Sequence, residues 1–144
     1  AASDVYKRQV VCDEPTSMLD VSIRISIMDL MLNLAKELEV SYLYITHDLA
    51  VARYMCNRIA VMFNGKIVEI AETEELLQNP LHPYTKRLIS SIPIPDPSFN
   101  REKYLINFDE LDKIISNNPD EKMVDIGGGH FVATHDTKEF FIDS

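Results

Sequence analysis

The stretch "VVCDEPTSMLD", residues 10–20, decides the fold class of this 144-residue sequence. It opens with a short apolar run that is typical of a strand buried within a parallel sheet. Two adjacent acids, Asp13 and Glu14, follow that run, and a proline-containing turn then leads to Asp20. Ligand sites in α/β proteins lie at the carboxyl ends of such strands, so this edge is the candidate site.

The residues that follow repeat the alternation of strand and helix. Residues 20–40 predict a helix of about five turns, with Asp20 as its cap. Residues 41–46, "SYLYIT", predict a second short strand, which ends at His47 and Asp48. Asp48 is the predicted cap of another short helix. The first helix has one predicted apolar face, made of Ile23, Ile27, Leu30, Leu34 and Leu38.

A hairpin and a short helix complete this part of the chain. Asn64-Gly65 separates two β-prone runs, which is a strong hairpin signal. Thr73 is the predicted cap of the helix that follows, and Asn79-Pro80 ends that helix. The order strand, helix, strand, helix, hairpin predicts an α/β fold with a parallel sheet and a small antiparallel addition.

The rest of the chain has a different composition. A proline-rich stretch surrounds a predicted helix at residues 84–91, and residues 101–144 hold ten acidic against five basic residues. Residues 108–116 predict a helix, and "GGGHFVATH", residues 127–135, predicts a tight turn that leads into a strand. The apolar content of residues 98–144 suits packing against a neighbouring core better than an independent fold.

Composition excludes several classes of protein. The net charge is −9 and no cluster of Lys and Arg exists, which argues against binding to nucleic acid or to an anionic membrane. No apolar run reaches the roughly 18 to 20 residues that span a bilayer. Cys12 and Cys56 lack the spacing of a zinc or redox pair, so we expect buried, reduced thiols in a cytosolic protein.

The first nine residues, "AASDVYKRQ", back-translate into a sequence that resembles a transposon adapter used in sequencing libraries. We therefore expect residues 1–9 to be an adapter scar and leave them out of fold reasoning. On this interpretation the native sequence starts at Val10, within a strand, and the chain is a fragment.

The polar residues at the sheet edge match the needs of ATP hydrolysis. Asp13, at the end of a strand, suits Mg²⁺ held through water, because Mg²⁺ keeps several waters and takes few carboxylates. Glu14 can orient or deprotonate a water, and His47 can contact a γ-phosphate oxygen. The alternative is that all three merely cap turns, but their combination across one helix favours the catalytic interpretation.

Residues 10–70 resemble the second half of an ABC-transporter ATP-binding subunit. "VVCDE" resembles the Walker B strand, "ITHD" resembles the switch region, and "SMLD" resembles the D-loop, although Met18 stands where alanine is usual. The resemblance implies the C-terminal part of a P-loop NTPase sheet. It also implies Mg²⁺ at Asp13, a catalytic base at Glu14, the switch histidine at His47, and contacts across a dimer from Ser17 and Asp20.

"NPLHPYTKRLISSIPIPDP", residues 79–97, narrows the resemblance to the C-terminal extension of oligopeptide and dipeptide importer ATPases. The implied function is an ATP-hydrolysing subunit that energises import of peptides or a related small solute. In that family the P-loop, Q-loop and signature motif precede Walker B, so we expect them upstream of this fragment. The predicted division of the chain is an adapter scar, a partial ABC ATPase domain, a proline-rich extension and an acidic accessory tail, at residues 1–9, 10–78, 79–97 and 98–144.

The same resemblance implies cofactors, partners and location. ATP and Mg²⁺ are the implied cofactors, and no iron–sulfur cluster is expected because no cysteine cluster follows the extension. The implied partners are a second ATPase subunit in a head-to-tail dimer, transmembrane permease subunits and, indirectly, an extracytoplasmic solute-binding protein, with no nucleic acid. The implied location is peripheral, on the cytoplasmic face of the cell membrane.

Two other functions stay open. A related ATPase of DNA maintenance or translation would share these motifs but predicts basic patches and no "LHPYTKRL" segment. A stand-alone, non-catalytic binding or dimerisation module is the second.

Three histidines lack metal-ligand spacing and are expected at the surface or in caps, and the glycine triplet lacks the context of a nucleotide loop. Three apolar residues of the long helix are expected in the core rather than in a partner groove: Ile23, Met28 and Met31. The three histidines are His82, His130 and His135.

Overall fold

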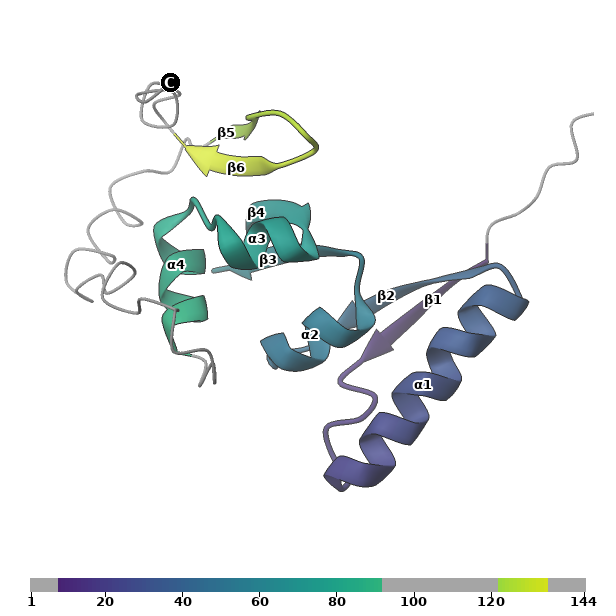
Figure 1. The fold of residues 1–144 in the computed structure, drawn as a ribbon. Coiled ribbons are helices and arrows are strands. Elements are labelled where there is room, and N and C mark those ends of the chain that lie inside the picture. Colours follow the sequence, from purple (N-terminus) through teal and green to yellow (C-terminus); the bar gives the residue numbers. More distant parts are fainter. Residues whose placement is uncertain (1–7, 92–121, 135–144) are drawn as a thin grey trace, which may run out of the picture. The chain divides into compact units, whose positions relative to one another are not determined.

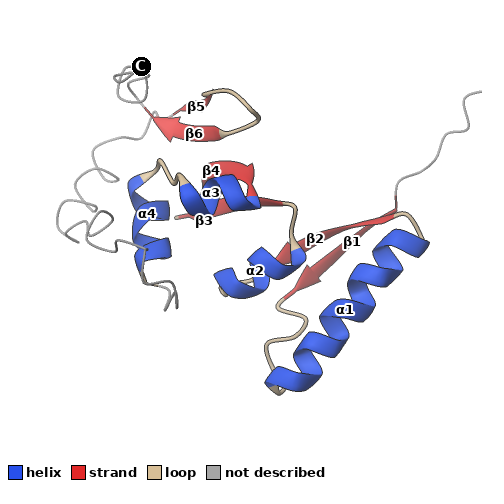
Figure 2. Cartoon of the chain, viewed as in Figure 1, coloured by secondary structure: helices blue, strands red, loops and turns tan. Residues whose placement is uncertain are grey.

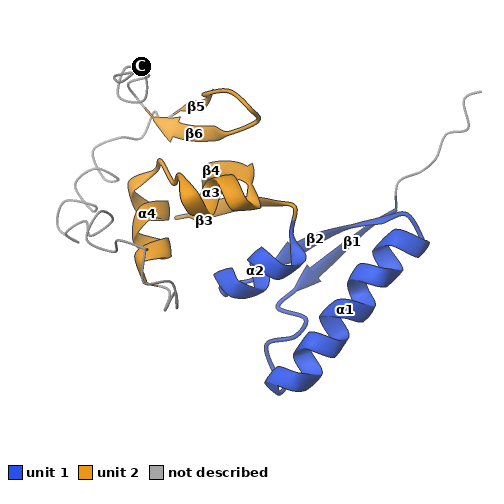
Figure 3. Ribbon diagram, in the orientation of Figure 1, with its two compact units in different colours: residues 1–56 blue, residues 57–144 orange. Residues whose placement is uncertain are grey.

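The computed structural model describes residues 8–91 and 122–134. The chain forms two compact units, residues 1–56 and 57–144, which are taken one at a time below (Figure 3). The helix predicted at residues 108–116 and His135 lie outside the described residues.

The first unit is a strand–helix–strand–helix segment (Figure 1). The two strands pair in parallel, in a register that runs from Arg8 opposite Val40 to Asp13 opposite Ile45. The first strand starts two residues before the predicted Val10. The predicted alternation of elements is confirmed, and it places the carboxyl ends of both strands side by side. The elements are β1 (Arg8–Asp13), α1 (Val21–Glu37), β2 (Val40–Ile45) and α2 (Leu49–Met55).

The core of this unit lies between α1, α2 and β2. Met28 is buried against Val51 and Met55, and Met31 packs partly buried beside them. Ile23, by contrast, is 50% exposed, so its expected place in the core is wrong. The predicted apolar face is wrong in part, because Leu30 and Leu38 are also exposed and the side of α1 that packs toward this core carries Met28.

The caps of the two helices differ. Asp48 caps α2, and its side chain accepts hydrogen bonds from the N–H groups of Ala50 and Val51, as predicted. Asp20 occupies the cap position of α1, but its side chain makes no capping hydrogen bond. The carboxylate of Asp20 therefore does not cap α1.

The second unit is built on an antiparallel four-stranded sheet in the order β3-β4-β6-β5 (Figure 2). The predicted hairpin is confirmed: Asn64 and Gly65 both have positive φ, 47° and 76°, as a tight two-residue turn requires. Helix α3 starts at Thr73, with Glu72 in the cap position, so the prediction of Thr73 as cap is wrong by one residue. The elements are β3 (Arg58–Phe63), β4 (Lys66–Glu72), α3 (Thr73–Gln78), α4 (Pro83–Ser90), β5 (Lys122–Asp125) and β6 (Phe131–Thr134).

The glycine triplet forms the turn between β5 and β6, and the strand predicted after it is confirmed as β6. Strand β5 was not predicted. Strand β6 pairs with β4, with Val132 opposite Glu69 and Phe131 opposite Ile70. Part of the predicted tail, residues 98–144, therefore belongs to the same sheet as the hairpin.

One buried carboxylate joins three segments of the second unit. Glu69, which is fully buried on β4, accepts hydrogen bonds from the backbone N–H groups of Leu81 (2.8 Å) and His82 (3.0 Å). Its third partner is Nε2 of His130, at 2.7 Å. Glu69 thus fixes the start of α4 and the β5–β6 hairpin onto β4, because a buried carboxylate is stable only when its acceptor positions are filled.

The two histidines beside Glu69 are buried, so an expected place at the surface is wrong for both. For His82 the alternative, a capping role, is confirmed: its Nδ1 accepts the N–H of Tyr84 at the start of α4. Burial lowers the pKa of His82, which favours the neutral imidazole that this cap needs.

Candidate functional site

The candidate site lies where β1 and β2 end. The N–H of Glu14 donates to the carbonyl of Ile45 across the two strands, at 2.9 Å, so Glu14 directly extends the parallel pair. Glu14 has φ of +46°, a left-handed conformation that is uncommon for a residue with a side chain. Such backbone strain concentrates at functional sites, because surrounding contacts must hold it in place.

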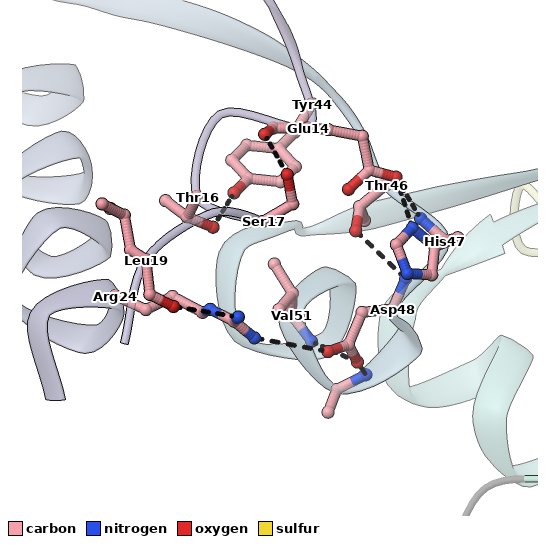
Figure 4. Close-up of polar contacts among 11 residues, drawn as sticks. Glu14, Thr16, Ser17, Leu19, Arg24, Tyr44, Thr46, His47, Asp48 and Val51 are labelled. Carbon is pink, nitrogen blue, oxygen red and sulfur yellow. Dashed lines mark hydrogen bonds and ion pairs between the residues drawn. The ribbon is translucent and has the colours of Figure 1, made fainter. Parts of the chain in front are cut away.

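Glu14 and His47 are in direct contact (Figure 4). Oε1 of Glu14 accepts the backbone N–H of His47 at 3.1 Å and lies 2.5 Å from Nδ1 of the same residue. The hydrogen bond from His47 lowers the pKa of Glu14, and the hydrogen bond to Glu14 raises the pKa of His47. The His47 side chain is 82% exposed, so its ring faces solvent while one edge holds the carboxylate.

The Glu14–His47 contact has a defined pH dependence. A raised pKa for His47 stabilises the fold below its ordinary value of 6.5, and this stabilisation is lost as the pH rises through the folded value. A lowered pKa for Glu14 stabilises the fold above its ordinary value of 4.5, and this is lost as the pH falls through the folded value. Both contributions are therefore fully present between about pH 4.5 and 6.5. The contact weakens when the pH falls through the folded pKa of Glu14 or rises through the folded pKa of His47.

We expect an NMR titration of the folded chain to give His47 a pKa above 6.5, and Glu14→Gln to return it toward that value. The buried His82 serves as the internal control, because burial lowers its pKa and the substitution leaves its surroundings intact. If His47 has the same pKa in both proteins, the contact does not exist in solution.

The turn after Glu14 is held by its own hydrogen bonds. Ser17 donates to the carbonyl oxygen of Glu14 from both its N–H (3.3 Å) and its hydroxyl (3.0 Å). Thr16 is 3% exposed and its hydroxyl lies 2.9 Å from that of Tyr44 on β2. Ser17, predicted as a D-loop residue, therefore lies against Glu14, whereas Asp20 is at the start of α1.

Sequence reasoning missed Thr16 and Tyr44. Tyr44 occupies an ordinary position in a strand, and nothing in the pattern shows that its hydroxyl reaches the turn. Thr16 has a weak signal, because a threonine after Pro15 in a turn has a polar group that needs a partner if it is buried.

Asp13 ends β1 opposite Ile45 and is exposed. Among residues 8–91 and 122–134, no three His, Cys, Asp or Glu side chains are grouped closely enough to hold a metal ion. A single exposed carboxylate fits Mg²⁺ bound mainly through water, since Mg²⁺ needs few protein ligands. The metal role of Asp13 stays a prediction.

A small cavity of about 70 Å³ lies behind the turn. Glu14, Ser17 and His47 form part of its lining, together with Tyr44 from β2. Such a space is large enough for a few waters among polar groups. The candidate base and the candidate switch histidine thus lie beside one polar cavity at the edge of the parallel pair.

Comparison with known proteins shows what this chain is similar to. Residues 68–125 match the family described as "Oligopeptide/dipeptide transporter, C-terminal region". The chain is 48% identical over 129 residues to the oligopeptide transport ATP-binding protein AmiF of Streptococcus pneumoniae, an alignment that covers 85% of this chain and 40% of that protein. It is 43% identical over 123 residues to the oligopeptide transport ATP-binding protein OppF of Bacillus subtilis, with the same coverage.

A further similar protein is named for glutathione import rather than oligopeptide transport. The glutathione import ATP-binding protein GsiA of Pectobacterium atrosepticum is 41% identical over 130 residues, which cover 88% of this chain and 21% of that protein. This chain thus spans about 40% or less of the length of these curated relatives. In the part of the chain that the structure describes, no helix is both long and apolar enough to cross a membrane. Residues 68–125 thus match the C-terminal region of the oligopeptide/dipeptide transporter family, and the chain is similar to part of the oligopeptide transport ATP-binding proteins.

Proposed function

We propose that the chain is part of an ATP-binding subunit of an ABC importer, and that residues 10–20 and 41–48 form the hydrolytic edge of its ATP site. The observation that carries this proposal is the Glu14–His47 contact at the carboxyl ends of two parallel strands. The names of its relatives support ATP binding, and they support a peptide or a related small solute as the cargo.

In this proposal each residue at the edge has a separate task. Glu14 orients and deprotonates the attacking water, and its contact with His47 keeps the carboxylate ionised and fixed in direction. The exposed ring of His47 is free to contact the γ-phosphate. Asp13 would hold Mg²⁺ through water, and the ion would neutralise charge that develops on the phosphates. Most of the catalysis is positioning and charge stabilisation.

The proposal extends to an assembly. Ser17 and Asp20 would contact a second ATPase subunit in a head-to-tail dimer, and Asp20 is suited to this because its side chain does not cap α1. The dimer would dock onto transmembrane permease subunits, served indirectly by an extracytoplasmic solute-binding protein. The subunit would then lie peripherally on the cytoplasmic face of the membrane. In this assembly the P-loop and signature motif come from parts of the full-length subunit other than residues 10–144.

We expect the 144-residue chain alone to bind ATP too weakly to detect at micromolar concentrations. Its four glycines lie in the Asn64-Gly65 turn and the β5–β6 turn, each of which joins two strands rather than a strand and a helix, and Asp13 with Glu14 repels a polyanion. The full-length protein encoded by the gene should bind and hydrolyse Mg-ATP, and His47→Ala should lower its turnover strongly while ATP still binds.

Calorimetry on the chain and steady-state phosphate release by the full-length protein test this proposal together. His82→Ala serves as the matched substitution, because His82 is buried in the second unit and caps α4. Micromolar affinity of the chain alone for ATP would show that it holds a complete nucleotide site of another kind. Normal turnover in the His47→Ala protein would show that His47 is not the switch histidine.

A further inference from the structure

Arg24 lies between the two segments that carry the candidate site, although it belongs to neither. It is in the first turn of α1, and its guanidinium has two separate contacts (Figure 4). Nη2 donates to the carbonyl oxygen of Leu19 at 3.2 Å, and Nη1 lies 3.9 Å from Oδ2 of Asp48. Leu19 directly precedes Asp20 of the D-loop segment, and Asp48 directly follows His47.

Asp48 is itself fixed, so the contact with Arg24 has a rigid end. One carboxylate oxygen, Oδ1, accepts the N–H groups of Ala50 (2.9 Å) and Val51 (3.4 Å) at the start of α2. The backbone N–H of Asp48 donates to the hydroxyl of Thr46 at 3.1 Å. The other oxygen, Oδ2, is the one that faces Arg24. The contact of Arg24 therefore reaches a residue whose backbone adjoins His47.

The other end of the connection is equally defined. The D-loop segment contacts Glu14 through Ser17, and Thr16 anchors it to Tyr44 on β2. Between these contacts and α1, the carbonyl of Leu19 is held by Arg24. The guanidinium is suited to this position because its planar fork of donors reaches two acceptors in fixed directions.

We propose that Arg24 is a positioning residue that couples the D-loop segment to the segment of His47. This inference rests on the proposed function, since the D-loop would contact the second subunit and His47 would contact ATP. Movement of Leu19 when two subunits meet would be transmitted through Arg24 to Asp48, and from there to the His47 side chain. The second subunit would thus set the position of His47 in the first.

If Arg24 had a purely structural role, its removal would lower the melting temperature; the coupling role predicts otherwise. The side chains of Arg24 and Asp48 are 26% and 41% exposed, and ion pairs of this kind add little to stability. Removing the guanidinium should therefore leave the melting temperature nearly unchanged. The effect should fall on turnover, because a displacement of about 1 Å at a catalytic group can lower a rate by up to about 100-fold.

The test is a double-substitution cycle in the full-length protein. Arg24→Gln should lower kcat about 10- to 100-fold with unchanged ATP affinity, and Arg24→Lys should recover part of the loss, since an ammonium keeps the charge but loses the fork. Asp48→Asn keeps the cap of α2 and removes the charge. The double variant should be no slower than Arg24→Gln alone. Lys36→Gln, on the same helix, controls for loss of a positive charge.

A second measurement does not depend on ATP hydrolysis. In the 144-residue chain, Arg24→Gln should shift the NMR signals of the His47 ring, whereas Lys36→Gln should not. If the wild-type full-length protein hydrolyses no ATP but these signals shift, the proposed function fails and the coupling stands. Normal kcat in Arg24→Gln, independent effects of the two substitutions, or unchanged His47 signals would each overturn the coupling.

Discussion

Glu14→Gln in the full-length protein is expected to lower ATP turnover about 100- to 10,000-fold, the range typical of losing a general base. The amide keeps the shape of the side chain, and its oxygen still accepts the backbone N–H of His47. It cannot take a proton from water. ATP affinity should not fall, because the substitution removes negative charge and no contact that binds phosphate.

Glu39 provides a matched control for this experiment. It is an exposed glutamate in the same unit, and its φ of 52° is close to the 46° of Glu14. Glu39→Gln therefore repeats the change of charge and the strained backbone away from the candidate site, and turnover should stay normal. Near-normal hydrolysis in the Glu14→Gln protein would show that another group is the base.

Glu69→Ala is expected to destabilise the second unit by several kcal/mol, because each buried donor left without its acceptor costs about 1–3 kcal/mol. The substitution leaves His130 and two backbone N–H groups, those of Leu81 and His82, without their acceptor. Glu69→Gln should cost about 1–3 kcal/mol, because one oxygen remains while the amide nitrogen faces a donor. Both substitutions should loosen the start of α4 and the β5–β6 hairpin together.

Hydrogen exchange measured by mass spectrometry can resolve this unit from the first. Faster exchange is expected in residues 81–90 and 122–134, with residues 21–55 unchanged. Glu72→Gln is the control, since this exposed residue ends the same strand and should alter stability by less than about 0.5 kcal/mol. If only one of the two segments loosens in Glu69→Ala, Glu69 does not join them.

Much of the first unit follows from local pattern in the sequence. An apolar run that ends at Asp13, a helical period and a second apolar run predict β1, α1 and β2, and the parallel pairing follows from the helix that connects them. The site prediction rests on the same logic, because strands that pair in parallel bring Glu14 and His47 to one edge. Their hydrogen bond was not predicted, since it depends on side-chain geometry.

The second unit shows what a single sequence does not reveal. Glu69 and His130 are 61 residues apart, and no periodicity relates them. Glu69 stands in a strand of mixed polarity, where alternation suggests an exposed acid, and His130 follows a glycine turn that suggests the surface. Only the pairing of β6 with β4 brings them together. Arg24 was missed for a similar reason, because a charged residue in a first helical turn is ordinary.

ATP-dependent association of the Glu14→Gln full-length protein tests the central claim most directly. That claim places Glu14 and His47 at the hydrolytic edge of an ATP site that closes between two subunits. Analytical ultracentrifugation with Mg-ATP should show a stable dimer that retains about one unhydrolysed ATP per subunit. The same protein with ADP should sediment as a monomer. A protein that stays monomeric with bound ATP, or that hydrolyses ATP and releases ADP at the wild-type rate, would contradict the claim.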